Sequence, residues 1–236
     1  MVFTTKTNHF IGSITINKPP VNALNSEDWI NFYKLFDELV FKEEIKVIII
    51  NSSGKGFCAG ADLNEHKNLA SKDKLKVSEK INDGVWKSVQ AIERSHVPVI
   101  VNCSNYVVGA GMLVAMSADF IFAEANTQFK LPGIRFGVFA GVSSALSMIP
   151  PSLAKKMLYT GEPIFAEELI KSGSILEICK DKDSMNKASY DLARTLASHN
   201  KEHLALLKSL ILKNNGQSTN LKKELDASLN ALKSLD

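Results

Sequence analysis

The strongest constraint on the fold of this chain is a pair of continuous apolar runs, each followed by a turn rich in small residues. The segments "IKVIII" (45–50) and "VPVIVNC" (97–103) consist mainly of apolar side chains, largely β-branched, and do not alternate with polar residues. Strands of that composition are buried on both faces, as in a parallel sheet covered by helices. The two runs therefore predict the central strands of an α/β fold.

The surrounding pattern alternates strands and helices up to about residue 180. The segment "GSITIN" (12–17) alternates like a half-buried strand, and Asn25 is a good N-cap for the helix that follows. Residues 64–80 are polar and lysine-rich, which indicates a mobile loop or a surface helix, and from Ser184 onward we expect two helical segments separated only by "NNGQST". We therefore expect a core over residues 1–180, in which right-handed crossovers connect parallel strands. A helical region is expected over residues 181–236.

Composition excludes several classes of protein. The formal charge is +3, from 28 basic and 25 acidic residues, which is too small to suggest a nucleic-acid binder. Cys58, Cys103 and Cys179 form no CxxC pair, so neither a disulfide framework nor a metal site is expected. No apolar run approaches the roughly 18–20 residues of a membrane span, and no signal peptide is evident. We expect a cytoplasmic protein that does not bind membranes.

The glycine-rich segment "SSGKGFCAGADLNEH" (52–66) follows the first buried run and matches no standard phosphate-binding loop. A P-loop needs Ser or Thr after its lysine, but Lys55 is followed by Gly56. The second small-residue turn, "GAGMLV" (109–114), has Val114 where a dinucleotide fingerprint needs glycine. Two functions stay open at this point: plain strand-to-helix turns, or turns whose backbone N–H groups stabilise an oxyanion.

Five motifs in order resemble the crotonase (enoyl-CoA hydratase/isomerase) superfamily over roughly residues 10–180. They are "NKPPVNALN" (17–25), "FCAGADL" (57–63), "VVGAGMLVAMSAD" (107–119), "FKLPGIRFGV" (129–138) and "LYTGEPIFAEELIKSG" (158–173). The resemblance implies a crotonase-like (ClpP/crotonase) spiral of ββα units. It also implies an enzyme of fatty acid metabolism, a lyase or isomerase, whose substrate is an acyl-CoA thioester. No tightly bound cofactor is implied, because coenzyme A enters as part of the substrate.

The resemblance also implies a set of site residues. The backbone N–H groups of Ala61 and Ala110 are expected to form the oxyanion hole for a CoA enolate. The expected contacts to the CoA thioester are Pro20, Val21, Ala23, Gly60, Ala61, Asp62, Leu63, Gly109, Ala110 and Gly111.

The chain departs from the family at the positions that move protons. Leu113 and Gly133 stand where hydratases carry two glutamates, and Gly141 stands where dienoyl isomerases carry an aspartate. Glu65 and His66 are the candidate replacements, and we favour Glu65 as the acid; Cys58 is expected to be a small structural residue. Three interpretations stay open: a hydratase or isomerase with an unusual acid, a decarboxylase or hydrolase, and a non-catalytic acyl-CoA-binding protein.

The C-terminal region carries an apolar stripe of Leu221, Leu225, Leu229 and Leu232 at helical spacing. Relatives assemble as homotrimers or dimers of trimers, so the stripe is expected to meet another subunit. The alternative is that it folds back on its own subunit.

Overall fold

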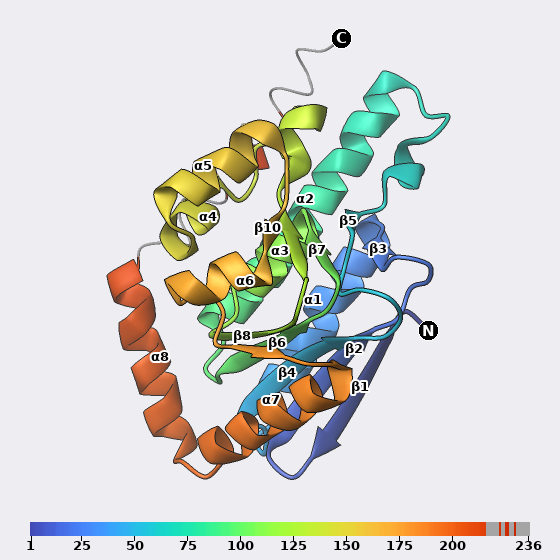
Figure 1. Cartoon of the computed structure of the whole chain (residues 1–236). Helices are drawn as coiled ribbons and strands as arrows, with labels where there is room; N and C mark the ends of the chain where they lie inside the picture. The colour runs from blue at the N-terminus through green and yellow to red at the C-terminus, as the bar shows by residue number, and fades with distance from the viewer. Residues whose placement is uncertain (216–221, 223–224, 227–228, 230–236) are drawn as a thin grey trace.

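The computed structural model describes residues 1–215, 222, 225, 226 and 229, and its centre is a six-stranded sheet (Figure 1). The strands lie in the order β1-β2-β4-β6-β8-β11. The outer pair β1–β2 is antiparallel and the other pairs are parallel. Their bounds are Phe3–Asn8, Ile11–Ile16, Val47–Ser52, Val99–Cys103, Phe120–Glu124 and Glu177–Cys179.

Two small sheets stand beside the large one. The first has the order β10-β9-β7, and the second pairs β3 with β5 in parallel. Their bounds are Ile164–Phe165 (β10), Gln128–Lys130 (β9), Tyr106–Val108 (β7), Ala23–Leu24 (β3) and Gly60–Ala61 (β5).

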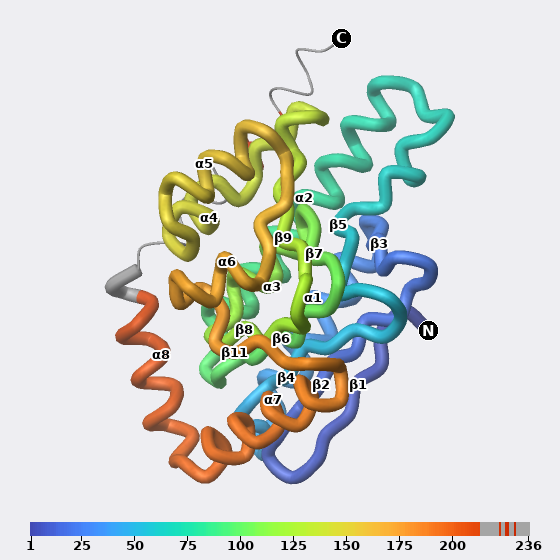
Figure 2. Tube along the Cα trace, in the orientation of Figure 1, coloured from blue at the N-terminus to red at the C-terminus, as the bar shows by residue number. Residues whose placement is uncertain are grey.

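Each turn of the chain places one strand in the large sheet, one in a small sheet and then a helix. The four repeats are β2–β3–α1 (Ser26–Val40), β4–β5–α2 (Ser71–Arg94), β6–β7–α3 (Ala110–Met116) and β8–β9–α4 (Val142–Met148). Figure 2 follows this winding along the chain. The predicted α/β spiral of ββα units is therefore confirmed.

Helices cover both faces of the large sheet, which explains the unbroken apolar runs. In β4, Ile48 and Ile50 join the core beneath α1 and α2, while Val47 and Ile49 face α7 (Lys182–Ala197). Because alternate side chains point to opposite faces and helices cover both, all four residues from Val47 to Ile50 are buried. Helix α7 packs on this sheet and contributes to the core. The predicted domain boundary near residue 180 stays a prediction.

Local signals predicted some helix ends and missed others. The Asn25 cap is confirmed: its side chain accepts from Asp28 N at 2.8 Å, and Asp28 accepts from Asn25 N at 3.0 Å. The lysine-rich stretch over residues 64–80 is mostly helical. It contains most of a short 3-10 helix at Leu63–His66 (η1) and the start of α2 at Ser71.

The expectation of one helical segment from Ser184 to "NNGQST" is wrong. Helix α7 ends at Ala197, and α8 (Lys201–Asn215) starts afresh because the Asn200 side chain accepts from the N–H groups of Glu202 and His203. The remaining elements are η2 (Pro132–Phe136), α5 (Pro151–Thr160), α6 (Ala166–Leu169) and η3 (Ile170–Ser172).

A buried lysine fastens α8 to the body of the protein. Lys208 is 4% exposed and donates to the carbonyls of Ile92 and Val97, to Ser95 Oγ and to Asp119 Oδ2, the last at 2.7 Å. Burial lowers the pKa of Lys208, and the attraction of Asp119 opposes that shift. Asp119 also accepts from Val99 N at 2.7 Å, so the contact ties α8 to α2 and to strand β6.

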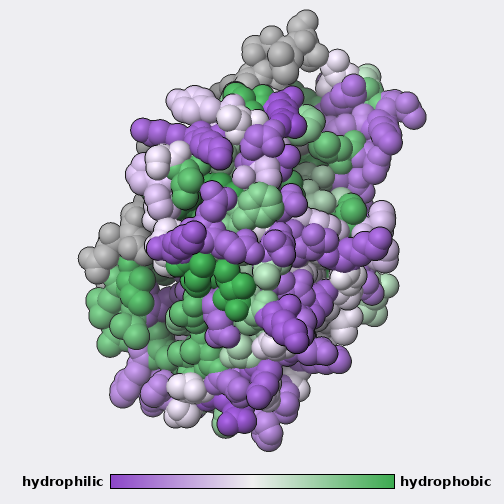
Figure 3. Space-filling view, in the orientation of Figure 1, coloured by the Kyte–Doolittle hydropathy of each residue, from purple (hydrophilic) through white to green (hydrophobic). Residues whose placement is uncertain are grey.

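The other side of α8 is apolar and exposed. Leu206, Leu207, Leu210 and Ile211 are between 47% and 60% exposed. Figure 3 shows hydrophobic side chains gathered over this helix. Across the described part of the chain, no helix combines the length and hydropathy needed to cross a bilayer.

We predict that Lys208→Met destabilises the protein by about 3 kcal/mol. Methionine keeps the length of the side chain but leaves Asp119 without its buried partner. Chemical denaturation followed by circular dichroism measures the change. The control is Lys187→Met, at an exposed position of α7, which should change stability by less than about 0.5 kcal/mol. Equal effects of the two variants would contradict a role for Lys208 in anchoring α8.

Candidate active site

The two glycine-rich turns that the sequence singled out lie against each other. Strand β5 pairs with β3, with Ala23 opposite Gly60. On its other side Cys58 forms an isolated bridge to Val107, and Val108 N donates to Cys58 O at 2.9 Å. The first turn therefore lies between the "NAL" loop and the second turn.

This contact requires glycine at two places. A Cβ at Gly60 would stand 2.8 Å from Val108 O and 3.3 Å from Ala110 N, and the φ angle of Gly60 is +88°. A Cβ at Gly111 would stand 2.7 Å from Cys58 Cβ. The start of α3 can therefore approach β5 only because both positions lack a side chain.

The two residues predicted to form the oxyanion hole line one cavity, and strand pairing fixes the direction of the Ala61 N–H. Asp62 N donates to Leu24 O at 2.8 Å, and successive N–H groups of a strand point to opposite sides, so Ala61 N–H points away from β3. Ala110 is the first residue of α3, and its N–H precedes the first hydrogen bonds of that helix, from Met112 and Leu113 to Gly109 O. Ala61 and Ala110 line the same cavity.

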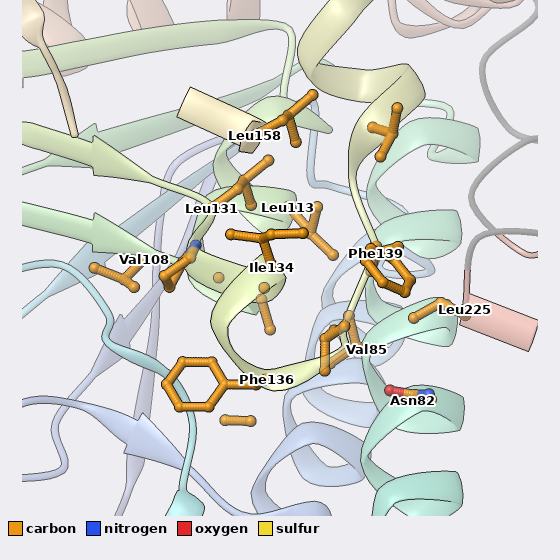
Figure 4. A pocket seen from close by; sticks show the side chains of 18 of the residues that line it. Asn82, Val85, Val108, Leu113, Leu131, Ile134, Phe136, Phe139, Leu158 and Leu225 are labelled. Carbon is orange, nitrogen blue, oxygen red and sulfur yellow. The ribbon is translucent and has the colours of Figure 1, made fainter. Parts of the chain in front are cut away.

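The cavity has a volume of about 620 Å³ and mostly apolar walls (Figure 4). Helices α2, α3, α4 and α5 and the segment after β9 supply the walls. Among the lining residues are Val85, Leu113, Leu131, Ile134, Phe136, Phe139, Leu158 and Leu225. Of the predicted stripe, Leu225 is buried in this wall and Leu229 is half-buried, whereas Leu221 and Leu232 lie outside the described residues. At Leu225 the stripe meets its own subunit.

Leu113 and Gly133 stand where the resemblance places two glutamates, and that assignment stays a prediction. Leu113 is 3% exposed, and a Cβ at Gly141 would stand 2.5 Å from Leu113 Cδ2. A Cβ at Gly133 would overlap the carbonyl oxygen of Val138, whose N–H donates to Gly133 O at 2.9 Å. A side chain at Gly133 would therefore require the turn to Val138 to move.

The loop expected to contact CoA is pinned to the first turn by Asn22. Its Nδ2 donates to the carbonyls of Ser53, Gly56 and Phe57 at 2.9–3.1 Å, and its Oδ1 accepts from Lys18 N at 2.7 Å. Lys18 also pairs with Asp28 at 2.6 Å and lies 3.6 Å from Asp62.

The residues predicted to contact CoA differ in their exposure. Pro20, Val21 and Leu63 are exposed, Ala23 and Asp62 are half-buried, and Gly60 is buried in the contact with Ala110. Their role in binding stays a prediction.

Glu65 and His66 point to different neighbours although they are adjacent. The Glu65 carboxylate accepts from Ser26 N at 2.8 Å and from Ser26 Oγ at 2.6 Å, at the start of α1. His66 lines the cavity, and its Nε2 lies 3.0 Å from Ser78 Oγ on α2. The use of Glu65 as an acid stays a prediction, and that use requires the carboxylate to leave Ser26.

Burial shifts the pKa values of two residues near the turns, Cys58 and Tyr106. Burial raises the pKa of Cys58 to about 12, so its thiol stays protonated at neutral pH. Burial also raises the pKa of Tyr106. Among the described residues, no three His, Cys, Asp or Glu side chains gather in a way that could hold a metal ion.

Ser78 is a polar lining residue that the sequence did not single out. Ser78 lies on the same face of α2 as Ile81, Asn82 and Val85, all of which line the cavity. Helical spacing from Val85 reaches Ser78, but that signal exists only once α2 is known to begin at Ser71.

Comparison with known proteins identifies relatives of the whole chain. The family model described as "Enoyl-CoA hydratase/isomerase" matches residues 6–235. The chain is 30% identical over 190 residues to a 2,3-dehydroadipyl-CoA hydratase of Escherichia coli, covering 79% of this chain and 72% of that protein. It is 26% identical over 188 residues to a (7aS)-7a-methyl-1,5-dioxo-2,3,5,6,7,7a-hexahydro-1H-indene-carboxyl-CoA hydrolase of Mycobacterium tuberculosis, covering 80% and 74%.

Solved structures share the fold. A crystal structure of an enoyl-CoA hydratase/isomerase from Mycobacterium paratuberculosis matches with a TM-score of 0.88 at 19% identity, covering 98% of this chain and 93% of that one. A probable enoyl-CoA hydratase from Mycobacterium thermoresistibile matches with a TM-score of 0.85 at 21% identity, covering 100% and 99%. The crotonase-like fold predicted from the sequence is confirmed.

We predict that Gly60→Ala damages the site and the fold together. The added methyl group meets Val108 O and Ala110 N, so β5 and α3 must separate, at a cost of about 2–3 kcal/mol in unfolding free energy. Thermal denaturation measures the loss. Gly54→Ala is the matched control: Gly54 also has a positive φ, of +84°, but no atom lies within 4 Å of a Cβ there. If both variants melt alike, backbone strain at glycine rather than the contact explains the effect.

Proposed function

The chain belongs to the enoyl-CoA hydratase/isomerase family, and we propose that it holds the carbonyl oxygen of an acyl-CoA thioester between the N–H groups of Ala61 and Ala110. The observation that carries the proposal is that these two residues, from separate turns locked together at Gly60, line one apolar cavity. Fixed N–H donors in a site that excludes water stabilise negative charge on a thioester oxygen. The chain is an acyl-CoA enzyme by family.

We propose that the CoA moiety of the bound substrate extends out of the cavity along the loop that Asn22 holds. Pro20, Val21, Ala23, Asp62 and Leu63 would contact it, with Gly109 and Gly111 keeping the second turn small enough for the thioester to approach. The exposure of Val21 and Leu63 beside the two turns supports this path. Coenzyme A enters as part of the substrate, and no tightly bound cofactor is proposed.

The walls of the cavity favour an uncharged, apolar acyl group. The described side chains around Leu113, Leu131 and Phe139 are mainly apolar, and burying an unpaired charge among them is costly. Leu225 lines the cavity, which supports a limit on the length of the acyl chain that fits there. We propose a cytoplasmic enzyme of acyl-chain metabolism.

The type of reaction depends on the acidic groups of the cavity wall, and Leu113 and Gly133 supply none. The packing at Leu113 and Gly133 supports chemistry other than a two-glutamate hydration. One relative is named a hydrolase, which supports hydrolysis as a second candidate beside hydration or isomerisation with an unusual acid. Decarboxylation needs little beyond the oxyanion hole and is a further candidate, while binding without turnover would indicate a non-catalytic acyl-CoA-binding protein.

We predict that Ala110→Pro lowers the turnover of an acyl-CoA substrate by about 10²–10³, because proline removes one N–H donor from the oxyanion hole. CoA affinity should change much less, since the proposed contacts to CoA lie elsewhere. Absorbance assays with crotonyl-, 3-enoyl- and malonyl-type thioesters measure turnover, and calorimetry measures binding.

The matched control is Ser71→Pro, which places proline at the first residue of α2, an exposed position. Both variants should keep the circular dichroism spectrum of the parent. Unchanged turnover in a folded Ala110→Pro variant would contradict the oxyanion hole.

We also propose that the protein forms a homotrimer or a dimer of trimers. The exposed apolar face of α8, with Leu207 and Ile211 one helical turn apart, supports an interface there.

We predict a trimeric or hexameric mass by light scattering at micromolar concentration. Introducing Leu207→Glu and Ile211→Glu together should shift the protein toward the monomer, because two carboxylates would have to be buried. Lys187→Glu on α7 is the control and should leave the mass unchanged. A monomer in the unmodified protein would refute the assembly.

A further inference from the structure

The cavity contains one pair of side chains arranged for nucleophilic chemistry. His66 Nε2 lies 3.0 Å from Ser78 Oγ, and both residues line the cavity together with Ala61 and Ala110. A hydroxyl within hydrogen-bond distance of an imidazole nitrogen is the arrangement by which a base activates serine. An oxyanion hole in the same cavity would complete the set of groups that acyl transfer requires.

The orientation of Ser78 differs from that of other serines within helices of this protein. Ser88, Ser189 and Ser209 donate to carbonyls three or four residues earlier, at 2.7, 3.1 and 2.7 Å. Such back-bonding is the usual state of a serine inside a helix. Ser78 instead places its oxygen beside an imidazole.

The short helix η1, which carries His66, is fastened by hydrogen bonds of its neighbouring residues. Glu65 fastens η1 to the start of α1 through Ser26, and the Asp62 side chain accepts from Asn64 N at 3.0 Å at the start of η1. Because Glu65 and His66 are adjacent, fixing one toward α1 fixes the other toward the cavity. Glu65 is thereby a positioning residue for His66.

The pair also lies where water can enter. His66 and Ser78 are half-buried, whereas Leu113 and Leu131 are buried deep in the wall. Lys155 and Tyr159 also line the cavity but are exposed on α5. Among the described lining residues, the His66–Ser78 pair therefore combines a nucleophile, a base and a route for water.

We propose that the protein hydrolyses acyl-CoA thioesters through Ser78 as nucleophile and His66 as base, which rests on the thioester site proposed above. The Ser78 oxygen bonds to the thioester carbon as its proton passes to His66 Nε2, and the carbonyl electron pair moves to the oxygen held by Ala61 and Ala110. The carbon–sulfur bond then breaks, and CoA leaves with the proton from His66. His66 takes a proton from water as the water oxygen bonds to the ester carbon. The bond from that carbon to Ser78 Oγ then breaks, Ser78 Oγ takes the proton back from His66 Nε2, and the carboxylic acid is released.

The test follows the release of CoA thiol from octanoyl-CoA with a thiol-reactive dye. The wild-type protein should release thiol well above the rate in buffer. Ser78→Ala should lower the rate by about 10³-fold or more, and His66→Gln by about 10²–10⁴-fold. His203→Gln, at an exposed histidine of α8, should stay within about twofold of wild type. Peptide mass spectrometry of the quenched reaction should find the octanoyl group on Ser78.

Calorimetry with octanoyl-CoA separates the two proposals. If the wild type does not bind the thioester, the proposed function fails. If it binds but releases no thiol, or if folded Ser78→Ala releases thiol at the wild-type rate, the hydrolase inference is overturned and the thioester site stands. Should Ser78→Ala not fold, Ser78→Cys takes its place: the introduced thiol should accumulate an octanoyl thioester, and the absence of that adduct overturns the inference.

Discussion

The architecture depends on one close backbone contact, between strand β5 and the start of helix α3. Because Gly60 and Gly111 lack side chains, Val108, Ala110 and Cys58 lie so close to them that an added methyl group would clash. The large sheet, the two-residue strands and the Asn22 hydrogen bonds all serve to hold these two turns in register. Because the potential donors are backbone groups, their positions are set by the packing of the fold, and few side chains are needed to define the site.

The cavity wall is packed tightly where the resemblance predicts acids in hydratases. Leu113 packs against Gly141, and the turn at Gly133 closes on Val138. A side chain at Gly133 would require this turn to move. Polar side chains of the cavity include His66 on η1 and Ser78 on α2, which lie within hydrogen-bond distance of each other.

Sequence patterns predicted the parts of the structure that local or periodic signals encode. The β-branched runs predicted the buried strands, Asn25 predicted the start of α1, and five motifs predicted the fold and the two turns. The break between α7 and α8 was missed because it depends on one Asn200 cap inside a stretch of strong helix formers. The different surroundings of Glu65 and His66 could not be predicted either, since they depend on Ser26 and Ser78, which are distant in sequence. Contacts of that kind follow from tertiary packing and leave no periodic trace.

Leu225 gives the cavity a wall that the core alone does not supply (Figure 4). The groups proposed for chemistry lie between residues 60 and 113, whereas Leu225 belongs to a segment more than a hundred residues later in the chain. Under the proposed function, the residues that react and a residue that limits the space for the acyl group would therefore come from separate parts of the sequence. Substitutions at Leu225 would then alter which acyl chains fit while the reacting groups stay unchanged, which would give an engineer a way to change the substrate range alone.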